Sequence, residues 1–246
     1  MCIRDRDYIR DNTSGSDYLE FHERRFAEHL SLFSYLCEHF SPLSRVLDIS
    51  TMPYTTGIMK YYHPGLSLVT IDLPEEMGGP PLSRFEELEV EEHYAVDLDS
   101  LDWNVFDKEV SRKGKFDVIF AGEVIEHLRI DFLEVVEFCL ACLRPGGIAV
   151  ITTPNFLSGW KLDRLIQGLN PQQRFKDYKN IAGGYHYREY TMKELDNIAR
   201  DAGAEVIARV YSDSLMEDHL HKTEETQYHF RENVVFVFSN EKVSIW

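Results

Sequence analysis

Two glutamates and two histidines in this sequence have the types and spacing of a proton-transfer or metal-binding site. Glu123, Glu126 and His127 form an E-x-x-E-H pattern, and on a helix these three side chains share one face. His186 lies in a separate segment, from which it could close the site. Such a set suits a hard or borderline divalent cation, Mg²⁺ or Mn²⁺. Without a metal, His127 or His186 could serve as a general base. A structural alternative is that the Glu-His pair caps and solvates a helix start while Glu123 alone contacts a ligand.

Three aspartates stand at or just after the ends of the first three predicted strands. They are Asp48, Asp72 and Asp97. Ligands of doubly wound sheets bind outside the carboxyl ends of the strands, so these side chains would face one crevice. An acid after the second strand can accept both hydroxyls of a ribose, and an acid after the third can accept an amine hydrogen of adenine. Each aspartate could instead cap a following helix, but three in register favour a nucleoside site.

Seven short apolar runs, most of them β-branched, predict the strands that must position these groups. The runs are 45–49, 68–73, 94–98, 116–121, 148–153, 205–210 and 234–238. Helical segments alternate with them, and this rhythm predicts an α/β fold, a doubly wound Rossmann-like sheet with helices on both faces.

Three helices are the clearest in the pattern. The first has apolar residues at three- and four-residue spacing, namely Phe26, Leu30, Phe33, Leu36 and Phe40. A second runs from about Glu123 to Leu143, although a capping box at Asp131 and Glu134 also permits two helices in succession. A third begins at the capping box of Thr191 and Glu194 and ends near Gly203.

The chain divides into an N-terminal helical extension, residues 1–42, and one domain, residues 43–246. Within that domain the stretch at about 154–190 is too long for an ordinary connection. It is rich in aromatic and basic residues, and insertions at this edge of a sheet often form lids or acceptor pockets. The aromatic content suits a phenol, a sugar or a lipid-linked glycan as the acceptor.

Composition narrows the class of partner. The 246 residues include 42 acidic and 26 basic side chains, for a net charge of -16, which counts against nucleic acid. No apolar run reaches the roughly 20 residues of a membrane span, and no secretory signal is visible, so we expect a cytoplasmic protein. Cys139 and Cys142 form a C-x-x-C pattern without a second ligand pair, so we expect buried core residues rather than zinc ligands.

The strand-end motifs together resemble those of class I S-adenosylmethionine-dependent methyltransferases. The matching segments, in order and spacing, are 45–49, 70–73, 96–98, 116–119 and 143–147, and the resemblance covers about 43–240. It implies a seven-stranded, mostly parallel sheet with an antiparallel last strand. It also implies that Asp72 binds the ribose of the methyl donor, that Asp97 and Leu98 approach the adenine, and that Asp48 lies near the methionine end.

The E-x-x-E-H pattern resembles that of ubiquinone-biosynthesis O-methyltransferases and of small-RNA terminal 2′-O-methyltransferases. In those families such residues bind a metal that orients the acceptor hydroxyls. The resemblance therefore implies an enzyme that methylates a hydroxyl of a small molecule, with an amine as the near alternative. It also places Glu123 beside the donor's methyl group.

One departure from the family concerns the turn after the first strand, which is usually rich in glycine. Here the first glycine after Asp48 is Gly57, and glycine permits positive φ and close contact with a ligand. Either Ser50, Thr51 and Pro53 build a different turn that admits the donor, or the chain is a non-catalytic methyltransferase-like binding or regulatory domain. A nicotinamide-dependent dehydrogenase fits less well, because no G-x-G-x-x-G follows the first strand.

Overall fold

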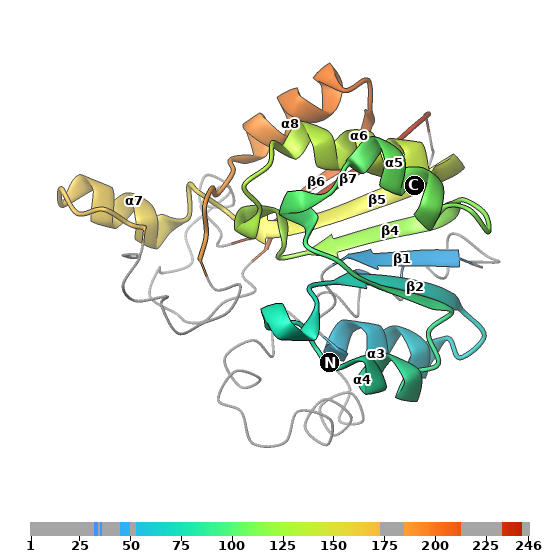
Figure 1. Cartoon of the computed structure of the whole chain (residues 1–246). Coiled ribbons are helices and arrows are strands. Elements are labelled where there is room, and N and C mark those ends of the chain that lie inside the picture. The colour runs from blue at the N-terminus through green and yellow to red at the C-terminus, as the bar shows by residue number, and fades with distance from the viewer. Residues whose placement is uncertain are drawn as a thin grey trace.

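One mixed sheet of seven strands organises the computed structural model, which describes residues 32, 33, 35, 45–49, 53–172, 185–212 and 233–242 (Figure 1). The strands are β1 (Arg45–Ile49), β2 (Ser67–Asp72), β3 (Glu92–Ala95), β4 (Phe116–Gly122), β5 (Leu143–Pro154), β6 (Glu205–Ser212) and β7 (Asn233–Ser239). Their order is β3-β2-β1-β4-β5-β7-β6. β1 to β5 pair in parallel, and β7 is antiparallel to both of its neighbours. The predicted sheet with an antiparallel last strand is confirmed.

Helices cover both faces of this sheet. They are α3 (Pro53–Tyr62), α4 (Leu82–Glu87), α5 (Trp103–Val110), α6 (Phe132–Cys142), α7 (Gly159–Ile166) and α8 (Met192–Asp201). In Figure 1, α3 and α4 lie on one side of the sheet, α5, α6 and α8 lie on the other, and α7 projects beyond the strand ends. Val46 and Leu47 are both fully buried, one in each of two apolar clusters. Because successive strand residues point to opposite faces, β1 is packed on both sides.

The predicted helix from Glu123 to Leu143 is in fact two short elements, the second of the alternatives considered. Ile125–His127 forms a single 3-10 turn, η3, and α6 starts after Asp131, whose side chain accepts a hydrogen bond from the amide of Leu133 at 3.0 Å. Glu123 precedes both elements with a φ of 56°. A left-handed residue cannot belong to a right-handed helix, so the shared helical face expected for Glu123, Glu126 and His127 does not form.

The third strand lies earlier in the chain than the predicted 94–98. β3 pairs with β2 only as far as Ala95, opposite Asp72. Beyond it, Asp97 begins another 3-10 turn, η2 (Leu98–Ser100), by accepting a hydrogen bond from the amide of Asp99. The capping tendency of aspartate at this position therefore ends the edge strand.

Two other local predictions are confirmed. Thr191 and Glu194 make a full capping box, and α8 ends at Asp201, close to Gly203. Cys139 and Cys142 are buried in the core on α6, and burial raises the pKa of the Cys142 thiol to about 12. Most of the predicted first helix lies outside the described residues, but Leu32, Phe33 and Tyr35 are helical, and Phe33 is buried.

No helix among the described ranges combines the length and the apolar character that crossing a bilayer requires.

The pairing of β4 with β5 depends on a close backbone approach at Gly147. A Cβ placed there would lie 2.8 Å from the carbonyl oxygen of Phe116 and 3.0 Å from that of Asp117. Both contacts are to backbone, which cannot swing aside as a side chain can. This approach lets β5 start at Leu143, opposite Phe116, before the regular pairing begins at Ile148.

We predict that Gly147→Ala lowers the free energy of unfolding by about 1–3 kcal/mol, the usual effect of overpacking a tight site. Urea unfolding followed by circular dichroism measures it. The matched control is Gly65→Ala, because nothing lies within 4 Å of a Cβ at that position. Equal stability of the two variants would contradict the steric role given to Gly147.

Candidate functional site

The candidate donor-binding groups lie at the carboxyl edge formed by the first three strands. Asp48 is in β1, Asp72 ends β2, and Asp97 follows β3. Leu98, the first residue of η2, is buried, and Ser50 lies outside the described residues. The edge that the sequence predicted is present, and its three carboxyl groups differ sharply in environment.

Asp48 is the most buried of the three, with 1% of its surface exposed. Its Oδ2 accepts a hydrogen bond from the hydroxyl of Thr56 at 2.9 Å. Burial raises the pKa of Asp48 to about 8; the hydrogen bond from Thr56 lowers it, and the charge of Asp72 raises it further. The neutral carboxylic acid is therefore the favoured form at neutral pH.

Asp72 and Asp97 each accept a hydrogen bond from a backbone amide close to them in the sequence. Oδ1 of Asp72 accepts a hydrogen bond from the amide of the following residue, Leu73, at 2.7 Å. Asp97 caps η2, as the structural alternative proposed for it. A carboxylate has about four acceptor sites, so a hydrogen bond from a neighbouring amide does not by itself prevent either group from accepting one from a nucleoside.

Glu123 faces the end of the sheet. Its Oε1 accepts hydrogen bonds from the hydroxyl of Thr152 in β5 and from the side-chain amide of Asn233 in β7, both at 2.9 Å. Its backbone is in the left-handed region, with a φ of 56°. Non-glycine residues held in this conformation cost energy and concentrate at functional sites.

The side chain of Glu126 contacts Thr153, the residue of β5 that follows Thr152. Glu126 is 1% exposed, and its Oε2 accepts from the hydroxyl of Thr153 at 2.9 Å. Successive side chains of a strand point to opposite faces, so the partners Thr152 and Thr153 direct Glu123 and Glu126 apart. This arrangement explains why the two glutamates do not meet in one site.

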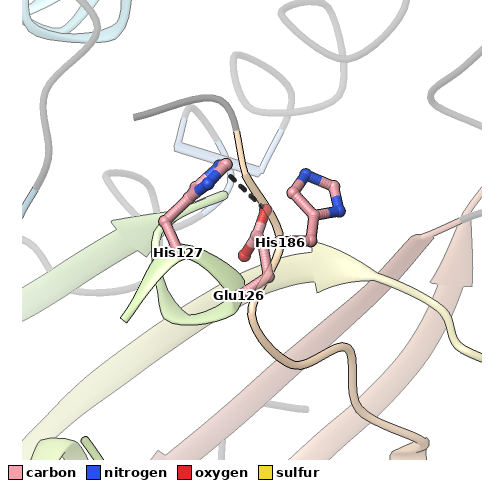
Figure 2. A group of neighbouring side chains, drawn as sticks. All are labelled: Glu126, His127 and His186. Atoms are coloured by element: carbon pink, nitrogen blue, oxygen red, sulfur yellow. Dashed lines mark ion pairs between the residues drawn. The ribbon is translucent and has the colours of Figure 1, made fainter. Parts of the chain in front are cut away.

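His127 and His186 complete a group with Glu126, drawn in Figure 2. Each of the three residues offers one ligand atom, and these atoms lie within 4.8 Å of one another. The two imidazole rings meet edge to face at 4.8 Å between centroids. The sequence predicted this association across separate segments. Glu123, the fourth predicted ligand, is not part of the group.

Backbone contacts bring the two histidines together. The carbonyl of Glu126 accepts a hydrogen bond from the amide of Tyr187 at 2.7 Å. Nδ1 of His127 lies 3.1 Å from the carbonyl oxygen of Tyr185. Since a carbonyl only accepts, Nδ1 of His127 carries the proton and Nε2 carries the lone pair. That Nε2 lies 3.8 Å from Oε1 of Glu126, a pairing of two acceptors that a cation or a proton between them would stabilise.

Three supporting contacts could not be predicted from the sequence. Thr153 holds Glu126, as described above. Lys161 of α7, 4% exposed, forms an ion pair with Glu189, which also contacts His186. Asp99 accepts two hydrogen bonds from Arg129, at 2.6 and 2.9 Å, and so joins η2 to the loop after η3. These residue types are common on surfaces, and nothing in their local sequence indicates burial or long-range pairing.

Comparison with known proteins identifies the family. A protein-family model described as a methyltransferase domain matches residues 18–209 of this chain. No curated protein sequence matches this chain significantly. A SAM-dependent methyltransferase from Archaeoglobus fulgidus superposes with a TM-score of 0.55 at 16% identity, covering 91% of this chain and 99% of that one. The CcbJ methyltransferase from Streptomyces caelestis gives 0.54 at 14% identity, covering 84% and 94%.

At these identities the solved structures establish a shared fold. The family match is independent of them and spans most of the chain, including the strand ends that carry Asp48, Asp72 and Asp97. The sheet order and the antiparallel β7 agree with it. The chain therefore belongs to the methyltransferase domain family, with the Rossmann-like class I fold that uses S-adenosylmethionine as its methyl donor.

Proposed function

We propose that this protein methylates a hydroxyl group of a small acceptor molecule beside Glu126, His127 and His186. The observation that supports this most directly is the convergence of a buried carboxylate and two imidazoles within 4.8 Å. Glu126 and His127 follow β4, which is paired with β1, the strand of Asp48, and His186 joins them from the segment between α7 and α8. The proposed acceptor site thus adjoins the proposed donor site along one sheet edge.

The residues at that edge fit the chemistry of S-adenosylmethionine. The donor has two ribose hydroxyls, an adenine amine and a positively charged methionine end. Asp72 is proposed to accept from the ribose, Asp97 with Leu98 to contact the adenine, and Asp48 with Ser50 to face the methionine end. Glu123, held at the strand end by Thr152 and Asn233, is proposed to contact the donor or the acceptor near the methyl group.

The proposed reaction is a direct displacement at the methyl carbon. The acceptor oxygen forms a bond to that carbon as the carbon–sulfur bond breaks, and the products are a methyl ether and S-adenosylhomocysteine. The hydroxyl proton passes to Nε2 of His127 or His186. Holding the acceptor oxygen in line supplies most of the acceleration, and proton removal adds to it.

A divalent cation, Mg²⁺ or Mn²⁺, fits the same three residues. Glu126 would supply an oxygen ligand, and the two histidines would each supply Nε2, with water completing the shell. When bound, such a cation lowers the pKa of an acceptor hydroxyl. His127 and His186 are 25% and 28% exposed, so an acceptor in solution has access to the cluster.

The acceptor is proposed to be a phenol, a sugar or a lipid-linked glycan, with an amine as the near alternative. Trp160 and Tyr187 of the segment after β5 are 43% and 46% exposed, and aromatic faces stack on planar rings and on sugars. The net charge of -16 disfavours a nucleic-acid acceptor. We also propose that the protein is cytoplasmic, as we expected from its sequence.

A first prediction concerns the ribose contact. Asp72→Ala removes the acceptor for two hydroxyls, and we expect the affinity for S-adenosylhomocysteine to fall about 10- to 100-fold, since hydrogen bonds to charged groups contribute about 1.5–3 kcal/mol. Calorimetric titration measures it, with the exposed Glu137→Ala on α6 as control. Unchanged affinity in Asp72→Ala would refute the assigned donor site. Failure of the unaltered protein to bind would favour the non-catalytic binding domain.

A second prediction concerns the cation. Glu126→Gln keeps the shape and the hydrogen bond from Thr153 but removes the charge. We expect calorimetry to show Mn²⁺ binding to the unaltered protein and a loss of at least tenfold in the variant, with S-adenosylhomocysteine affinity unchanged. Methyl transfer to a panel of phenols and sugars, measured as the S-adenosylhomocysteine formed, should fall in the variant together with Mn²⁺ binding. If the unaltered protein bound no Mn²⁺, the metal part of the proposal would be wrong, and proton removal by histidine would remain.

A third prediction follows from the raised pKa of Asp48. The folded state holds this proton up to about pH 8, whereas the unfolded chain releases it near the ordinary aspartate pKa of 3.8. Between these values the folded state binds more protons, so stability falls as pH rises, by about 1 kcal/mol per pH unit at most, and the loss levels off above the folded pKa. Asp48→Asn should flatten this slope in urea unfolding measured from pH 5 to pH 8. An identical slope in both proteins would show that Asp48 is ionised in the fold.

A further inference from the structure

We infer that Glu189, which is paired with the buried Lys161 of α7, is a positioning residue that sets the tautomer of His186. The inference deepens the proposed function and rests on it, because His186 is one of the groups proposed to act on the acceptor. The fold joins Lys161 to Glu189, which lies far along the sequence, and Glu189 in turn contacts His186.

The first link is the hydrogen bond between His186 and Glu189. Nδ1 of His186 lies 2.9 Å from Oε1 of Glu189. An ionised carboxylate only accepts hydrogen bonds, so Nδ1 must carry the proton of the neutral imidazole. The lone pair then lies on Nε2, the nitrogen that can bind a cation or take a proton.

The second link is the charge of Glu189. Its side chain is only 9% exposed, and burial alone would raise its pKa. The hydrogen bond from His186 and the charge of Lys161 outweigh that effect, and the pKa of Glu189 is lowered from its usual value. The carboxylate of Glu189 thus lies between the ammonium of Lys161 and Nδ1 of His186, where it is placed to accept hydrogen bonds.

The third link is Lys161, whose side chain is 5% exposed. Its ammonium contacts the carboxylate of Glu189 and donates to the backbone carbonyl of Asn155 at 3.0 Å. A buried ammonium is costly unless it is paired, so these two partners account for its position. Lys161 belongs to α7, and α7 is thereby joined to the segment that carries His186.

The stem of the insertion orients this ion pair. Asn155 and Tyr190 form a bridge, and the amide of Phe156 donates to the carbonyl of Tyr190 at 3.0 Å. The bridge brings the start and the end of the insertion together, so Lys161 and Glu189 meet from opposite sides. Carboxylates placed in this way orient many metal-binding histidines, and their removal usually costs 10- to 100-fold in metal affinity or activity.

His127 shows the same control by a different partner. The carbonyl of Tyr185 places the proton on Nδ1 of His127, and Glu189 does so for His186. Both imidazoles therefore have the lone pair on Nε2. Without Glu189, His186 would be free to adopt the other tautomer, in which Nε2 carries the proton and cannot act as base or ligand.

The test compares two variants of the full chain that differ in one group. Lys161→Met with Glu189→Leu replaces the ion pair by apolar side chains, a change that buried pairs often tolerate. Lys161→Met with Glu189→Gln restores a neutral acceptor of similar shape. Imidazole ¹⁵N spectra, recorded above the ordinary imidazole pKa and assigned with His186→Gln, report which nitrogen is protonated. Calorimetry reports the affinity for Mn²⁺, and thermal melting followed by circular dichroism reports folding.

We expect the leucine variant to shift His186 toward the tautomer with the proton on Nε2 and to lose 10- to 100-fold in Mn²⁺ affinity. The glutamine variant should recover both properties. Asp163→Asn, an exposed carboxylate on the same helix, should match the unaltered protein. A leucine variant that melts as a folded protein and keeps the proton on Nδ1 would overturn the inference.

The outcomes separate this inference from the proposed function. If the tautomer shifts as expected while the unaltered protein binds no Mn²⁺, Glu189 positions His186 and the proposed cation is wrong. If Mn²⁺ binds equally well to the unaltered protein and both variants, and the tautomer does not change, the cation site stands without Glu189 and the inference fails.

Discussion

The hydrogen bonds to the backbone carbonyl of Glu126 are the constraint on which the proposed site depends. This one oxygen accepts from the amides of Tyr187 and Arg188, at 2.7 and 3.4 Å, and it joins the turn after β4 to the return of the insertion. The side chain of the same residue is bound to β5 through Thr153. The two histidines come together because each is a neighbour in sequence of these joined positions. A site built in this way inherits the rigidity of the central strands.

The two proposed halves of the site are supported differently. The donor half is made of carboxyl groups at the ends of parallel strands, where the topology alone brings them to one edge. The acceptor half requires the insertion, which the Asn155–Tyr190 bridge and the ion pair of Lys161 with Glu189 attach to the sheet. We therefore expect changes in the insertion to alter the acceptor chemistry while the donor edge keeps its geometry.

Electrostatics also separate the groups. Asp48 is buried beside a hydroxyl and favours its neutral form, whereas Glu189 is buried beside an ammonium and favours its charged form. Burial is the main cause of the raised pKa of Asp48, whereas the hydrogen bond from His186 and the charge of Lys161 outweigh burial at Glu189. A carboxyl group poised to ionise is suited to a cationic ligand, and one that favours its charged form is suited to holding an imidazole.

The sequence by itself determined the fold class, the seven-stranded sheet and the capping box at Thr191, because periodicity, caps and strand-end motifs are local signals. It also predicted from residue types that His186 would meet the Glu126–His127 pair, but only the backbone contacts of the folded chain bring these segments together. The roles of Asp48, Asp72 and Asp97 stay predictions, as do those of Ser50, Leu98 and Glu123. Only the tertiary structure decided that Glu123 leaves the cluster, since its left-handed backbone and its bonds to β5 and β7 depend on neighbours far along the chain. Only the tertiary structure, likewise, joined Lys161 to Glu189, because a lysine and a glutamate give no local sign that folding will bury them together.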